Sequence, residues 1–296
     1  MGIFDFFKRS KDQKDSQKNE QNQNPNAEAD FKEMDRETLN EVITIIDRPI
    51  EESLVSNVNF YKDAICPYCS SKLDKSPLRK TKCPYCHNYI FVRTNMITNE
   101  KMLLTEEQVN KLEAERQKVS IIESILMNDS GIRAEFKKVK DELKNENKKV
   151  PDVDILWGLL NEKGSEYAKR NLWGLFRNTR YDMLEILNAE GRLEDALGMA
   201  LEVCYYDING PNNITTNDPA ILKEFPPFDP ELGFVAPALV FSIKELKDKL
   251  NLKWEDIKDL FLKRANQVRM SIMRVSPKKA WDILYDEIKD EGETLE

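Results

Sequence analysis

Two copies of the tetrapeptide Cys-Pro-Tyr-Cys constrain the fold of this chain more than any other feature. They supply Cys66, Cys69, Cys83 and Cys86, with thirteen residues between the two copies. A pair of cysteines separated by two residues can direct two thiolates at one ion, and two such pairs complete the tetrahedral coordination that zinc prefers. The pattern therefore predicts one structural zinc ion held by these four side chains.

The residues around the cysteines suggest how the site is built. A turn-prone pair follows each copy, and the segment Tyr89–Arg93 then has the composition of a strand. This layout resembles a zinc ribbon, in which two cysteine knuckles grip one metal ion. The resemblance implies a small module at residues 61–98 that depends on the metal to fold, because so short a segment buries little apolar surface.

A redox function is the alternative interpretation of Cys-Pro-Tyr-Cys, since the glutaredoxin motif has the same sequence. In that family the motif opens a helix, whose N-terminus lowers the pKa of the first thiol. Neither copy here is followed by an amphipathic helical pattern, so the metal site is favoured. The single histidine, His87, adjoins Cys86 and is expected to be a turn residue, and Cys204 is expected to lie in the core.

The first 30 residues differ in composition from the remainder of the chain. Residues 8–30 are almost entirely polar, and such a segment cannot offset its conformational entropy by burial. We therefore expect residues 1–30 to form a disordered arm. Its tip carries four large apolar side chains: Ile3, Phe4, Phe6 and Phe7. The tip either inserts into a partner groove or a membrane interface, or has no binding role.

Helices are expected on both sides of the zinc module. Residues 31–60 are predicted to form a helical segment that leads into the zinc module, although residues 54–60 also fit a strand. Thr105 and Gln108 have the spacing of a capping box, which predicts a helical hairpin over residues 104–149. The hairpin resembles a short helical oligomerisation module through these residues: Gly131, Ile132, Glu135, Phe136, Lys140 and Leu143. An ordinary hairpin is the alternative.

The remainder of the chain, residues 151–290, has the periodicity of a multi-helix domain. Residues 181–197 resemble one tetratricopeptide-type hairpin, in which Gly191 forms the turn and Ala196 lets two helices meet closely. One unit implies the packing of a helix pair rather than a repeat array. A long loop is expected at residues 208–233. The predicted fold class is mainly α, with a small zinc ribbon near the N-terminus followed by a multi-helix body.

Charge is distributed unevenly along the chain. The net charge of −8 argues against nucleic-acid binding by the protein as a whole. The zinc module is nevertheless basic, and its candidate nucleic-acid contacts are Lys72, Lys75, Arg79, Lys80, Lys82 and Arg93. Tyr68, Tyr85, Tyr89 and Phe91 are available for base stacking.

Two functional hypotheses follow. The favoured one is an adaptor that binds another macromolecule, preferably a protein, through its zinc ribbon and helical body. The alternative is a protein that binds DNA or RNA through the basic ribbon. The sequence contains no phosphate-binding loop, dinucleotide fingerprint or histidine-based triad, so we predict no enzymatic activity. It also lacks a membrane-spanning apolar run and a secretory signal, and paired cysteines suit a reducing compartment, so we expect a cytoplasmic protein.

Overall fold

The structure is a computed structural model that describes residues 36–216 and 218–293, with side chains described as far as Lys289. The predicted arm at residues 1–30 and its apolar tip lie outside the described residues. Contacts divide the chain into two compact units, residues 1–41 and 42–296. The described part of the first unit is helical, and the elements named below belong to the second. Within the described part, no helix is long and apolar enough to cross a membrane.

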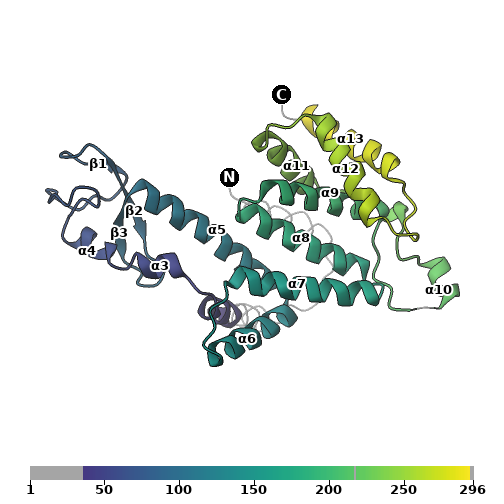
Figure 1. Ribbon diagram of the computed structural model, residues 1–296, viewed down its shortest axis with the longest axis horizontal. Helices are drawn as coiled ribbons and strands as arrows, with labels where there is room; N and C mark the ends of the chain where they lie inside the picture. The colour runs from purple at the N-terminus through teal and green to yellow at the C-terminus, as the bar shows by residue number, and fades with distance from the viewer. Residues whose placement is uncertain (1–35, 217, 294–296) are drawn as a thin grey trace, which may run out of the picture. The chain divides into compact units, whose positions relative to one another are not determined.

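A three-stranded antiparallel sheet organises the region around the cysteines (Figure 1). Its strands, in spatial order, are β1 (Thr81–Lys82), β2 (Tyr89–Thr94) and β3 (Lys101–Leu104). We call residues 64–104, which contain the sheet and the four cysteines, the cysteine module. The strand predicted at Tyr89–Arg93 is confirmed as β2.

The sheet of the cysteine module is buried on both faces. Alternate strand residues point to opposite faces. Ile90 and Leu103 pack with the cysteines, whereas Phe91, Met102 and Leu104 pack on the other side. That second side is covered by the end of α3 (Pro49–Ser53), by α4 (Asn57–Lys62) and by the start of the following helix. The sequence does not decide whether residues 54–60 form a strand. In the structure they form a turn followed by a helix.

Helix α5 (Glu106–Asn128) belongs to two cores at once. Its first turns place Val109 and Leu112 against the sheet, and its later turns place Ile122 and Leu126 in the core of the helical body. The predicted capping box at its start is confirmed, because the side chain of Thr105 accepts a hydrogen bond from the amide of Gln108 and the Gln108 side chain accepts one from the amide of Thr105.

Helix α6 (Ser130–Asn145) follows α5 directly. The carboxylate of Asp129 caps it by accepting a hydrogen bond from the amide of Ile132 at 2.9 Å. Ile132 and Phe136, two of the three large apolar residues in the resemblance to an oligomerisation module, are buried in the core of the helical body, and Leu143 is partly buried against it. Their side chains are thus used for packing within the chain.

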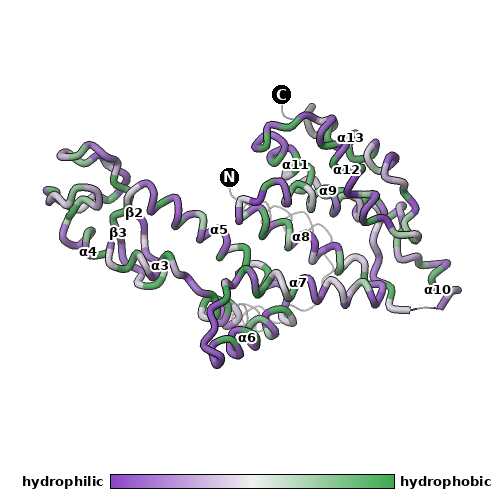
Figure 2. The backbone as a smooth tube through the Cα atoms, in the orientation of Figure 1, coloured by the Kyte–Doolittle hydropathy of each residue, from purple (hydrophilic) through white to green (hydrophobic). Residues whose placement is uncertain are grey.

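The helical body is built around α9 (Leu193–Asn209), in which every residue from 199 to 209 is buried. The helices packed on it are α8 (Trp173–Ala189), α11 (Pro237–Lys249), α12 (Trp254–Val268) and α13 (Pro277–Glu293), and α7 (Asp152–Lys169) packs on α8. Hydrophobic and hydrophilic residues alternate along these outer helices (Figure 2), as expected where each helix buries one face. The mainly α fold class is confirmed.

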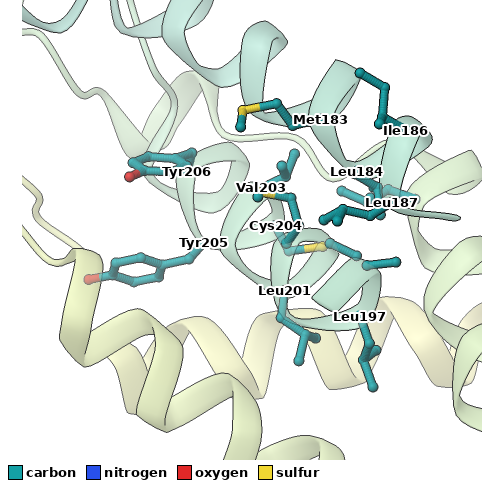
Figure 3. Close-up of a cluster of buried hydrophobic side chains, with 14 of the residues drawn as sticks. Met183, Leu184, Ile186, Leu187, Leu197, Leu201, Val203, Cys204, Tyr205 and Tyr206 are labelled. Atoms are coloured by element: carbon teal, nitrogen blue, oxygen red, sulfur yellow. The ribbon is translucent and has the colours of Figure 1, made fainter. Parts of the chain in front are cut away.

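Helices α8 and α9 form a tight hairpin. The predicted turn at Gly191 is confirmed, since this residue has a φ of +72°, where a glycine avoids the strain of a side chain. Ala196 is fully buried, as expected for a small residue at a close helix contact. Figure 3 shows Met183, Leu184 and Leu187 of α8 gathered beside residues of α9.

The segment predicted as a loop at residues 208–233 is more structured than expected. The first two residues of this segment belong to helix α9. Helix α10 (Pro219–Glu224) and the 3-10 turn η1 (Pro230–Leu232) form within the remainder of the segment. The side chains of Asp218 and Asp229 cap these two short elements, each of which begins with a proline. At the end of α9, Gly210 has a φ of +63° and a Cβ there would lie 1.8 Å from the carbonyl oxygen of Asp229.

A partly buried carboxyl on α8 makes the stability of the helical body depend on pH. Burial, reinforced by the negative charges of Asp129 and Glu185, raises the pKa of Asp182 to about 7. The folded state therefore holds this proton more tightly than the unfolded state, and folding free energy is lost as the pH rises from about 4 through about 7.

We expect Asp182→Asn to remove this loss. The free energy of unfolding at pH 8 should rise by about 1–3 kcal/mol, with little change at pH 4, in denaturant unfolding at the two pH values. Asp259→Asn, at an exposed position on α12, is the matched control and should show no such pH dependence. An equal effect of Asp182→Asn at both pH values contradicts the assignment.

Candidate metal centre

The two Cys-Pro-Tyr-Cys copies fold into the same turn. The amide of Cys66 donates to the carbonyl of Ser71 at 3.0 Å, and the amide of Cys83 donates to Asn88 at 2.9 Å. The residue after the second cysteine of each copy, Ser70 or His87, adopts a left-handed conformation with φ of 58° or 61°. Neither copy lies at the start of a helix, so the structure lacks the feature that activates the thiol in the glutaredoxin motif.

The four sulfur atoms converge on one point. All four Sγ atoms lie within 4.8 Å of one another. Two of the separations run between copies: Cys66 to Cys86 is 3.8 Å and Cys69 to Cys83 is 3.9 Å. A tetrahedral ion with sulfur ligands at about 2.3 Å requires sulfur–sulfur edges of about 3.8 Å. The arrangement is thus that of a metal-binding cluster, and both distances far exceed the roughly 2.05 Å of a disulfide.

Backbone amides of both turns point at the sulfurs. The first cysteine of each copy accepts hydrogen bonds from the amides two and three residues later, and the second accepts one from the amide two residues later. Hydrogen bonds from the Ser71 hydroxyl and amide lower the pKa of Cys69 to about 6, whereas burial raises the pKa of Cys66 to about 12. Bound metal would supply the positive charge that lets the buried thiols ionise.

The two copies differ in their surroundings despite their identical sequences. The hydroxyl of Tyr68 accepts a hydrogen bond from the amide of Glu106 at 2.8 Å, which docks the first turn on the start of α5. The equivalent Tyr85 of the second turn is 58% exposed. The second turn therefore presents an aromatic side chain to solvent, while the first attaches the module to the next helix.

The predicted basic residues do not share one environment. Five are exposed, namely Lys72, Lys75, Arg79, Lys80 and Lys82. Arg93 is half-buried and forms a salt bridge with Glu113 at 2.6 Å, so it is already paired within the chain. The ammonium of Lys80 lies over the rings of Tyr89 and Phe91, 4.7 and 4.5 Å from their centroids. Of the aromatic residues proposed for stacking, Tyr68, Tyr85 and Tyr89 are exposed and Phe91 is buried.

The two remaining residues with reactive side chains have structural positions. His87 is exposed in the second turn and is absent from the ligand cluster, which consists of four cysteines among the described residues. Cys204 is fully buried in α9, and burial raises its pKa well above the ordinary value. The prediction that Cys204 is a core residue is confirmed.

The helical body contains buried ion pairs that the sequence pattern does not predict. Glu202 contacts Arg180 at 2.8 Å and Arg264 at 3.0 Å, and Asp207 contacts Arg177 at 2.6 Å. The one sequence signal for these ion pairs is the presence of two acidic residues, Glu202 and Asp207, within the apolar run of α9. Their arginine partners lie on other helices with ordinary amphipathic patterns, so the sequence alone does not pair them.

Comparison of the chain with protein-family models, with curated proteins and with solved structures finds no match.

Metal removal should unfold the cysteine module without unfolding the helical body. Metal binding contributes about 10–16 kcal/mol of folding free energy in small zinc-finger modules, whereas the core around α9 contains no ligand of the cluster. We expect a chelator to accelerate amide hydrogen exchange in the two cysteine turns and β1, with protection of α8 and α9 retained.

Two cysteine variants separate this effect from a general loss of stability. Cys66→Ser should reproduce the exchange pattern of the chelated protein, and Cys204→Ala should keep the metal and the wild-type pattern. Unchanged exchange in the cysteine turns after complete metal removal contradicts a structural role for the ion.

His87→Gly tests whether the histidine is a ligand. Glycine adopts the left-handed conformation of this position readily, so the variant should keep the full metal content measured by elemental analysis. Cys86→Ser, one residue earlier, should lose metal under the same conditions. Loss of metal from His87→Gly that matches the loss from Cys86→Ser would make His87 part of the coordination.

Proposed function

We propose that this chain is a binding protein whose metal is one structural zinc ion held by Cys66, Cys69, Cys83 and Cys86. Four thiolates at tetrahedral spacing are the ligand set of structural zinc sites, and they leave no open position for a catalytic water. The repeated turns, each with amides directed at sulfur, support a zinc-ribbon interpretation of the cysteine module. All five cysteines are free of disulfides, which also suits a reducing compartment such as the cytoplasm.

The favoured partner is a protein, because large apolar side chains of the helical body are exposed to solvent. A single segment of the helical body, residues 221–241, has five exposed large apolar side chains: Ile221, Phe225, Leu232, Phe234 and Phe241. Phe234 is 68% exposed and Phe241 is 62% exposed. Large apolar side chains left in water favour contact with a protein partner. The role proposed is therefore that of an adaptor rather than an enzyme.

Substitution of two phenylalanines should weaken this interaction. A partner that copurifies with the tagged full-length chain would be purified and its Kd measured against three forms of the protein. We expect Phe234→Ser combined with Phe241→Ser to raise the Kd about tenfold or more, because buried aromatic anchors dominate such interfaces. Ile283→Ser, at an exposed apolar position of α13, should leave the Kd unchanged. An unchanged Kd in the double variant contradicts a role for these two phenylalanines in binding.

Nucleic-acid binding by the cysteine module is the second candidate, and the exposed side chains around the second turn favour it. Lys75, Arg79 and Lys82 are exposed, as are Tyr85 and Tyr89. Lysine and arginine side chains can neutralise phosphates, and exposed tyrosines can stack on unpaired bases. The pairing of Arg93 with Glu113 removes it from this set.

A salt series with single-stranded RNA and DNA tests this second candidate. We expect binding that weakens steeply with salt, and a slope of log K against log salt that falls by about 3 in a variant with alanine at residues 75, 79, 80 and 82. A control with alanine at four exposed lysines of α12 and α13 carries the same charge change: Lys258, Lys263, Lys278 and Lys279. Absence of binding at low salt, or equal slopes in the two variants, rejects the nucleic-acid hypothesis.

A further inference from the structure

A cavity of about 390 Å³ lies between helices α7, α8, α9 and α12. One part of its wall is apolar and includes Leu160, Phe176 and Met183. Asn161 and Ser165 of α7 also line the cavity and are themselves exposed, so it is accessible from solvent along α7. The volume is within the range of about 300–1,000 Å³ that is typical of small-molecule sites.

The charged part of the wall is a set of three side chains from three helices. Glu202 of α9 has a side chain that is 3% exposed. Arg180 of α8 donates to its two carboxylate oxygens from Nε and Nη2 at 2.8 and 3.2 Å. Nε of Arg264, on α12, lies 3.0 Å from Oε2 of the same carboxylate. Two guanidinium groups therefore face one carboxylate, and the cavity wall keeps a surplus positive charge.

The arginines also have hydrogen-bond donors to spare. A guanidinium carries five N–H donors and no acceptor. The buried Nε atom of Arg264 faces Oε2 of Glu202 without hydrogen-bond geometry, so it forms no hydrogen bond with the described residues. Nη1 of Arg180 is 3.5 Å from the sulfur of Met183, which is a weak acceptor. The wall thus combines surplus positive charge with unsatisfied donors, a combination that an oxyanion would complete.

We propose that this cavity binds a small molecule that carries a carboxylate or phosphate group joined to an apolar part. The anionic group binds to Arg264 and Arg180, because the planar fork of a guanidinium matches the geometry of both groups. The apolar part packs against Leu160, Phe176 and Met183. This site is separate from the proposed partner-binding function, since it uses none of the cysteines and none of the exposed apolar residues at 221–241.

The test is a ligand titration of the full-length, metal-loaded protein at constant ionic strength, with thermal denaturation as the readout. Phenyl phosphate and benzoate are the probes, and inorganic phosphate and acetate are the same anionic groups with little or no apolar part. We expect a saturable rise in Tm with phenyl phosphate or benzoate at concentrations where the small anions have less effect. The stronger of the two probes identifies the anionic group that the site prefers.

Two variants assign the effect to the cavity. Arg264→Gln should weaken binding of the stronger probe about tenfold or more, since a hydrogen bond to a charged group is lost. Lys258→Gln carries the same charge change at an exposed position of α12 and should bind as the wild type does. Ser165→Trp keeps all three charged residues and obstructs the exposed side of the cavity, so it should abolish the saturable shift even if Arg264→Gln fails to fold.

Three results would overturn the proposal. They are the absence of a saturable shift with either aromatic probe, equal affinity in Arg264→Gln and Lys258→Gln, and undiminished binding by Ser165→Trp.

Discussion

The convergence of four sulfur atoms within 4.8 Å is the constraint on which the cysteine module depends. The apolar cluster beneath the sulfurs is small, and two of its six buried members are the ligands Cys66 and Cys83. Four thiolates this close repel one another unless a cation lies between them. A bound ion would convert that repulsion into a cross-link between two turns, and the amides directed at the sulfurs would reduce the remaining negative charge. Coordination would thereby hold the two cysteine turns together, while apolar burial covers the opposite face of the sheet.

Helix α5 connects the cysteine module to the helical body. Its capping residue, Thr105, directly follows strand β3, and the hydroxyl of Tyr68 binds the next amide in the chain. Farther along, Arg116 forms a salt bridge with Glu51, whose side chain is 1% exposed, and Arg48 forms one with Glu123. Loss of a partner from such a buried pair is strongly destabilising. The Tyr68 contact couples the start of α5 to the cysteine module. The two salt bridges couple later turns of α5 to α3 and its N-cap residue, and Ile122 and Leu126 belong to the core around α9.

The cysteine cluster and several local elements could be predicted from sequence because their determinants are local. Two Cys-Pro-Tyr-Cys turns, the capping pair at Thr105 and Gln108, and Gly191 at a helical turn each act over a few residues. Nonlocal features escaped prediction. The order at residues 218–232 depends on contacts such as the approach of Asp229 to Gly210. The pairing of Arg93 with Glu113, and of Glu202 with two arginines, joins residues whose patterns in sequence are those of ordinary charged positions.

The central claim is that one zinc ion is bound by four thiolates. X-ray absorption at the zinc edge, on full-length protein purified under reducing conditions and with its metal content measured, tests it most directly. The account predicts one zinc per chain, in line with a single cluster in the described residues, and a first shell of four sulfurs at about 2.3 Å. Zinc far below one per chain, or a shell that contains nitrogen or oxygen ligands, would contradict it.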